Sequence, residues 1–92
     1  MVFIITFHSV YQALNFEKQF AGTGLSFILR PVPREISSSC GIAAQVTAEE
    51  SRVKQIWEAC KELRVETEAL YYFDKINGKA NVTLISSSDD AE

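Results

Sequence analysis

The first strongly apolar stretch of the chain, residues 2–7, constrains the fold more than any other segment. Its residues are Val, Phe, Ile, Ile, Thr and Phe, so every position is β-branched or aromatic. Such side chains favour strands, and a strand without polar alternation is typical of one that is buried on both faces. The stretch therefore predicts the central strand of a sheet.

Two amphipathic helices are expected beside this strand. Ser9 and Gln12 form a capping-box pattern, which predicts a helix over residues 10–21, and Thr47 with Glu50 predicts a second helix start in the same way. Apolar side chains recur at helical spacing in both segments: Ala13, Phe16 and Phe20 in the first, and Val53, Ile56, Cys60 and Leu63, flanked by Trp57, in the second. Each helix should pack one face against the sheet.

Further strands are predicted at residues 25–30, 42–46 and 66–73, and the pair Asn77-Gly78 predicts a hairpin that returns as an added strand over residues 80–85. The order β-α-β-β-α-β is that of a ferredoxin-like two-layer sandwich, whose antiparallel sheet has the strand order 4-1-3-2. We therefore expect an α+β fold, with a single domain over residues 1–85 and a disordered acidic tail over residues 86–92.

Composition argues against several classes of protein. With 92 residues the chain can form one small core, and a net charge of −3 leaves no basic surface for nucleic acid. The two cysteines have neither a metal-ligand spacing nor a disulfide framework, which favours a reducing, cytoplasmic setting. No export or membrane segment is visible. We expect no metal, cofactor, nucleic acid or membrane partner.

The loop over residues 31–41 is the one that resembles a chemical site. It contains both prolines of the chain, three serines, a cysteine and a glycine: Pro31, Pro33, Ser37, Ser38, Ser39, Cys40 and Gly41. The prolines stiffen its start, and Gly41 gives the backbone freedom beside Cys40. A thiol held in this way is a candidate nucleophile. The alternative is a small, half-buried residue that begins a strand.

The expected fold places several polar residues near this thiol. The end of the first strand, the start of the first helix and the start of the third strand would lie at the same edge of the sheet. His8, Ser9 and Cys40 would then be neighbours, with Arg30 and Arg34 adding positive charge from the loop. A helix N-terminus and hydrogen-bonding or cationic neighbours favour thiolate over thiol. No carboxylate has a sequence position that clearly orients His8, which by itself is as consistent with a structural role. Cys60 is expected to be part of the core.

The run of residues 32–41, together with Phe7, His8 and Ser9, resembles a bacterial family of selenium/sulfur carrier-like proteins over roughly residues 3–73. The resemblance implies that Cys40 carries sulfur or selenium as a persulfide or perselenide and passes it between donor and acceptor proteins. The residues expected to assist the thiol or to line its binding site are His8, Arg34, Ser9, Ser37, Ser38, Ser39 and Gly41.

Two other functions are compatible with these residues. An interaction or regulatory module would use the exposed edge of the strand at residues 25–30, or the surface around Tyr71, Tyr72 and Phe73, to form a homodimer or to bind an enzyme. A thiol enzyme would turn over a small electrophile. Reactivity of Cys40 separates the module from the other two functions, and turnover separates an enzyme from a carrier. We favour a carrier over an enzyme.

Overall fold

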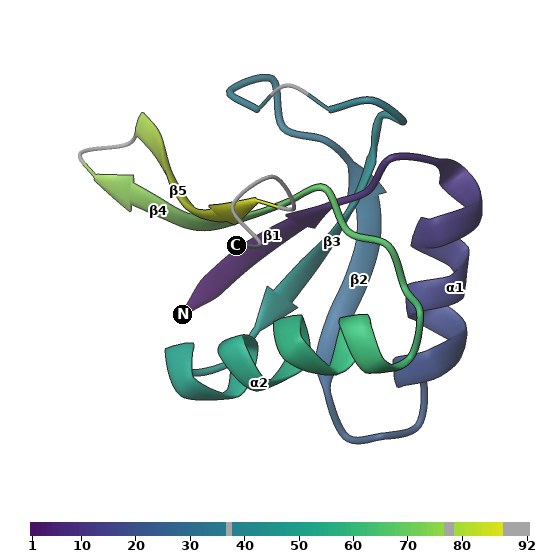
Figure 1. Cartoon of the computed structure of the whole chain (residues 1–92). Helices are drawn as coiled ribbons and strands as arrows, with labels where there is room; N and C mark the ends of the chain where they lie inside the picture. The colour runs from purple at the N-terminus through teal and green to yellow at the C-terminus, as the bar shows by residue number, and fades with distance from the viewer. Residues whose placement is uncertain (37, 77–78, 88–92) are drawn as a thin grey trace.

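The computed structural model describes residues 1–36, 38–76 and 79–87 (Figure 1). These residues form an antiparallel sheet and two helices, which confirms the predicted α+β class. The elements are β1 (Val2–Thr6), α1 (Val10–Phe20), β2 (Ser26–Pro31), β3 (Ile42–Thr47), α2 (Glu50–Glu62), β4 (Ala69–Ile76) and β5 (Lys79–Ser87).

Within the described residues, the strands form one antiparallel sheet in the order β2-β3-β1-β4-β5. As its apolar sequence predicts, β1 is central, and its last residue, Thr6, lies opposite Ala43 of β3 and Ala69 of β4. The four-strand order 4-1-3-2 expected for a ferredoxin-like fold is therefore not the order of the whole sheet. The succession β4-β1-β3-β2 is present within it, but β5 pairs along β4 and takes the outer position, because hairpin strands pair with the strand that precedes them.

Both helices pack against the same face of the sheet, and the main core lies between them and β1, β3 and β4 (Figure 1). Aromatic side chains from β1, α1 and β2 meet there. The Phe16 ring centroid lies 4.6 Å from that of Phe20 and 5.2 Å from that of Phe27. The predicted apolar stripes are thus confirmed except at Leu63, which caps the end of α2 and is 41% exposed.

The opposite face of the sheet carries a smaller apolar cluster. Ile4, Ala43 and Ile36 form its buried part, and side chains of β4 and β5 pack around them. Ile4 alternates with the core residues Phe3 and Ile5, so its side chain points away from the helices. Because Ile36 belongs to the loop between β2 and β3, that loop folds over the face that the helices leave uncovered.

The helix starts differ in part from the capping-box prediction. Ser9 Oγ accepts a hydrogen bond from the Gln12 N–H at 3.3 Å, as predicted, but Gln12 Oε1 accepts from the Glu66 N–H at 3.1 Å. The predicted cap at Thr47 is wrong. Helix α2 has Glu49 at its N-cap without a side-chain cap bond. Pairing with β1 continues past Thr47, because the Ala48 N–H donates to the Met1 carbonyl at 3.0 Å, so the helix begins two residues later than predicted.

Two element boundaries also differ from the expected ones. β4 begins at Ala69 and not at residue 66. β5 continues to Ser87, so the first two residues of the expected tail belong to a strand. The predicted turn at Asn77-Gly78 and the remainder of the tail, residues 88–92, lie outside the described residues. Neither α1 nor α2, the helices of the described ranges, is long and apolar enough to cross a bilayer.

Candidate functional site

The loop between β2 and β3, residues 32–41, is closed and anchored by its own backbone. The Val32 N–H donates to the Gly41 carbonyl at 3.0 Å, next to the last residue pair of β2 and β3. The Ile36 N–H donates to the Pro33 carbonyl at 2.9 Å, which forms a turn, and both of these side chains are buried. The described part of the loop is therefore attached to the sheet at its two ends and at the turn formed by Pro33 and Ile36.

Cys40 is half-buried and packs against the edge of the helix-side core. Its sulfur makes two contacts with one residue: the thiol donates to the Ile42 carbonyl at 3.2 Å, and the Ile42 N–H donates to the sulfur at 3.4 Å. Gly41 between them has φ 81°, in the left-handed region, and a Cβ there would meet nothing within 4 Å. This conformation folds the Cys40 sulfur back toward the Ile42 amide, a donor that can stabilise a thiolate.

A carboxylate holds the residue directly before Cys40. Ser39 Oγ donates to Glu68 Oε2 at 2.8 Å, and the Ser39 N–H donates to Glu68 Oε1 at 3.3 Å. Glu68 is fixed in turn, because its own N–H donates to the Thr6 carbonyl at 2.7 Å. We call the Glu68 carboxylate and the two Ser39 donors the Glu68 clamp. It ties the Cys40 loop to the edge of the sheet where β1 ends and β4 begins.

His8 lies beside the same carboxylate. Its Nδ1 is 4.0 Å from Glu68 Oε2, and its side chain is 47% exposed. The two residues meet because β1 and β4 are antiparallel, so that the residues following β1 adjoin those preceding β4. Thr6 is paired with Ala69, and His8 lies two residues beyond Thr6. His8 and Ser39 therefore share one carboxylate, and the loop and the end of β1 are connected through it.

The electrostatics of Glu68 keep it ionised. Burial raises the pKa of this carboxyl, but the bonds from the Ser39 hydroxyl and N–H and the charge of His8 outweigh burial and leave the pKa below its usual value. The Ser38 hydroxyl also contributes to the lowering. The Ser38 hydroxyl oxygen is buried and has no partner at full hydrogen-bond geometry within the described part of the chain. Because Glu68 is ionised near neutral pH, its hydrogen bonds to Ser39 hold the Cys40 loop most firmly there.

The other residues predicted for the site have varied surroundings. Ser9 caps α1 close after His8, Arg34 is exposed at the turn of the loop, and Ser37 lies outside the described residues. Arg30 extends along the sheet, where its Nη1 donates to Gln45 Oε1 at 2.7 Å. The chemical roles expected of His8, Ser9, Arg34, Ser38, Ser39, Cys40 and Gly41 stay predictions.

Glu68 is the member of this site that sequence reasoning missed. The sequence showed no carboxylate placed to orient His8, and the structure supplies one. The available signal was the strand predicted at residues 66–73, whose start adjoins the end of the central strand in an antiparallel sheet. A strand that starts at residue 66 places Glu68 inside the strand. The observed strand starts at Ala69, and this leaves Glu68 at the sheet edge.

The second thiol is sealed in the core, as predicted. Cys60 is fully buried on the inner face of α2, and burial raises its pKa to about 12. A thiol with this pKa is protonated and unreactive at neutral pH. Among the residues that the structure describes, no three His, Cys, Asp or Glu side chains are grouped so that they could hold a metal ion.

Comparison with curated proteins and with solved structures found no match. One family model, described as Putative Se/S carrier protein-like, matches residues 3–72. The match runs from β1 into β4 and includes the Cys40 loop, His8 and Glu68. Since it covers more than half of the chain, the protein belongs to this family of Se/S carrier-like proteins.

Proposed function

We propose that the protein accepts a sulfur or selenium atom on Cys40 and passes it to a partner protein without turning over a substrate of its own. Membership of the Se/S carrier-like family supports this proposal. The observation that carries it is the contrast between the two thiols. Cys40 is half-buried beside a donor amide in an anchored loop, whereas Cys60 is sealed in the core with its pKa raised to about 12.

The transfer needs no external oxidant or reductant. The Cys40 thiolate attacks the outer sulfur of a donor persulfide, R–S–SH, so that a new S–S bond forms on Cys40 and the donor leaves as the thiolate R–S⁻. Attack on R–S–SeH places selenium on Cys40 in the same way. In the second step, a nucleophile of the acceptor attacks the outer chalcogen, and the electron pair of the broken bond returns to Cys40 as thiolate.

The surrounding residues have different parts in this proposal. The Ile42 N–H, which donates to the sulfur at 3.4 Å, stabilises the thiolate that attacks first and leaves last. The Glu68 clamp acts as a positioning device, because it fixes Ser39 directly before Cys40. The His8 ring, whose Nδ1 lies 4.0 Å from Glu68 Oε2, joins the end of β1 to the same carboxylate.

Intact-protein mass spectrometry tests the proposal. The protein is incubated with a cysteine desulfurase and cysteine, or with selenocysteine in its place. We expect one added chalcogen atom that a reducing agent removes. The adduct should persist in Cys60→Ala, which serves as the matched control, and be absent in Cys40→Ala. An unmodified wild-type protein, or an adduct that survives Cys40→Ala, would contradict the proposal.

A second candidate function, self-association, is favoured by one row of side chains on the face without helices. The strand register places Ile28, Gln45, Ile4, Tyr71 and Leu84 in line across the sheet. The two ends of the row, Ile28 and Leu84, are 58% and 54% exposed. Light scattering over a range of protein concentrations tests this candidate. A dimer that Ile28→Lys dissociates would support it, and a monomer at every concentration would exclude it.

A further inference from the structure

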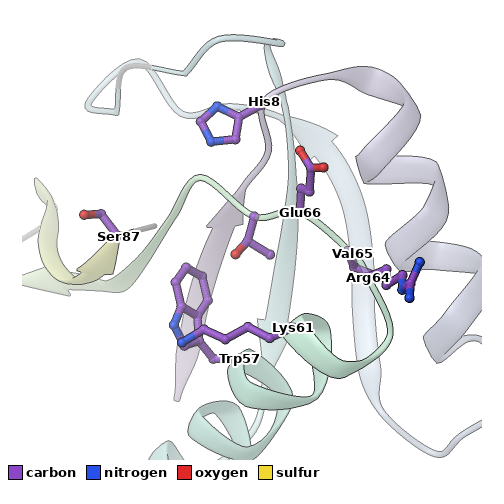
Figure 2. A pocket seen from close by; sticks show the side chains of 8 residues that line it. His8, Trp57, Lys61, Arg64, Val65, Glu66 and Ser87 are labelled. Atoms are coloured by element: carbon purple, nitrogen blue, oxygen red, sulfur yellow. The ribbon is translucent and has the colours of Figure 1, made fainter. Parts of the chain in front are cut away.

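A cavity of about 400 Å³ opens next to His8, between the end of α2, the connection before β4 and the end of β5 (Figure 2). Its inner wall consists of the buried side chains of Trp57, Val65 and Thr67. The less buried side chains of His8, Lys61 and Ser87 complete its lining. Figure 2 shows the Trp57 indole and the His8 imidazole on opposite sides of this space. Its volume and apolar wall are those of a small-molecule site, and the aromatic rings suit a flat ligand.

Lys61 supplies a positive charge that can hold an anion at this cavity. Glu66 contributes one negative charge, and Figure 2 shows the Arg64 side chain directed away from Trp57 and His8. Lys61 is paired with Glu58, its Nζ 3.7 Å from Glu58 Oε2, but both side chains are more than half exposed. Such a surface pair is weak, so it leaves the Lys61 ammonium available to a ligand. Figure 2 shows the Lys61 side chain extending toward Trp57, which places the charge beside the aromatic wall.

We propose that this cavity binds a small organic anion with a flat apolar body and a single carboxylate. The apolar body lies between Trp57 and His8, and the carboxylate is directed toward Lys61. This site does not depend on sulfur transfer, since Cys40 is not among the lining residues. It adjoins the Glu68 clamp through His8, which lines the cavity and lies 4.0 Å from Glu68. Binding of a ligand in the cavity should therefore also change the environment of Ser39.

The test uses 1-naphthylacetate and its neutral analogue 1-naphthylacetamide, which have the same flat body. Amide and indole NMR signals are followed during titration of the intact protein at low salt. We expect saturable shifts at the Trp57 indole N–H and at the amides of residues 64–67, with a smaller shift at Ser39. The carboxylate should bind more tightly than the amide and lose that advantage as salt is added, because ions screen exposed charges.

Charge-reversal variants complete the test. Lys61→Glu should weaken binding of the carboxylate by at least about fivefold and leave binding of the amide unchanged. Arg52→Glu makes the same change in net charge at an exposed position of α2 that does not line this cavity, and it should leave both affinities unchanged. The proposal is overturned by an absence of saturable shifts, by equal affinity for the two probes, or by equal effects of the two variants. Repeating the titration on Cys40→Ser separates this outcome from that of the carrier proposal.

Discussion

At the scale of single residues, Glu68 connects the residue before Cys40 with His8 and the end of β1. It receives two hydrogen bonds from Ser39, lies beside His8, and is attached through its backbone to the last residue of β1. Hydrogen bonds to an ionised acceptor are stronger than neutral ones, and two of them on one residue also define its orientation. The position of the Cys40 loop therefore depends on a residue that is remote from it in the sequence.

We predict that Glu68→Gln loosens this loop without unfolding the protein. The substitution keeps one carbonyl acceptor for Ser39 but removes the charge and the second acceptor oxygen. Stability should fall by about 1 kcal/mol, and amide exchange should accelerate at residues 39–42 while the sheet amides keep their protection. Glu66→Gln is the matched control, because Glu66 is exposed and makes its hydrogen bond to Gln12 through its backbone. Equal exchange in the two variants would contradict the role of the clamp.

The clamp should also respond to pH in a defined direction. The pKa of Glu68 is lower in the folded protein than in the unfolded chain, where a glutamate titrates at about 4.3. Its stabilising contribution is therefore complete above that value and is lost as pH falls through the lower folded pKa. The difference in loop exchange between wild type and Glu68→Gln should be constant near neutral pH and vanish in acid. A difference that persists below the pKa of the folded carboxyl would show that the charge is irrelevant.

The two thiols should differ sharply in reactivity. Iodoacetamide at pH 8 should modify Cys40 and spare Cys60, whose pKa is raised to about 12 by burial in the core. Peptide mapping of the alkylated protein measures both sites. Modification in urea is the control, since unfolding exposes Cys60 and should make the two rates similar. Faster modification of Cys60 in the folded protein would contradict the assignment of Cys40 as the working thiol.

At the scale of elements, the loop between β2 and β3 covers part of the sheet face that is opposite the helices. Both helices pack on one face, and Ile36 from the loop fills the cluster on the other with Ile4 and Ala43. Pro31 is accommodated in β2 because that strand is at the edge of the sheet, where a residue without an N–H can be tolerated. The position of the Cys40 loop therefore depends on the packing of Ile36 as well as on the hydrogen bonds to Glu68.

We predict that Ile36→Ala destabilises the protein by about 2 kcal/mol, the lower end of the cost of truncating a buried aliphatic side chain. Ile36 is 7% exposed, whereas Ile28, on the same face, is 58% exposed. Ile28→Ala is therefore the matched control and should have a much smaller effect. Urea unfolding of the two variants measures the difference. Equal effects would mean that the loop is not anchored through Ile36.

At the scale of the whole molecule, β5 is an addition to a core that the rest of the chain forms. Among the residues that the structure describes, the buried members of the helix-side cluster lie between Phe3 and Leu70, and the family match ends at residue 72. β5 contributes the half-buried Val82 and Ile85, and it covers the edge of β4. The central core should therefore survive its removal.

We predict that a chain ending at residue 76 still unfolds cooperatively, but with a stability lower by about 2 kcal/mol, the value of one well-buried aliphatic side chain. It should also associate more readily, because an uncovered β4 presents unpaired backbone groups at an edge. Urea unfolding and light scattering measure the two effects. A broad, non-cooperative transition would show that β5 is part of the essential core.

The sequence by itself determined the elements and the inner faces of this protein. Residues 2–7 indicated a central strand, and the apolar spacing of both helices identified the buried faces, including that of Cys60. The loop sequence identified Cys40 as the candidate thiol. These features are local, because strand propensity and helical periodicity are properties of neighbouring residues. Capping at Thr47 failed as a prediction because pairing with β1 continues to Ala48, whose N–H donates to the Met1 carbonyl, and delays the start of the helix.

Only the tertiary structure decided how the site is assembled. Glu68 reaches Ser39 across 29 positions of sequence, and the Gln12 side chain binds the Glu66 N–H across 54, contacts that no local pattern encodes. The cavity beside His8 likewise needs α2, the connection before β4 and the end of β5 together. The physical reason is the same in each case. The antiparallel register of β1 and β4, and the hairpin of β5, bring distant polar groups to one sheet edge, and that register depends on packing of the entire core.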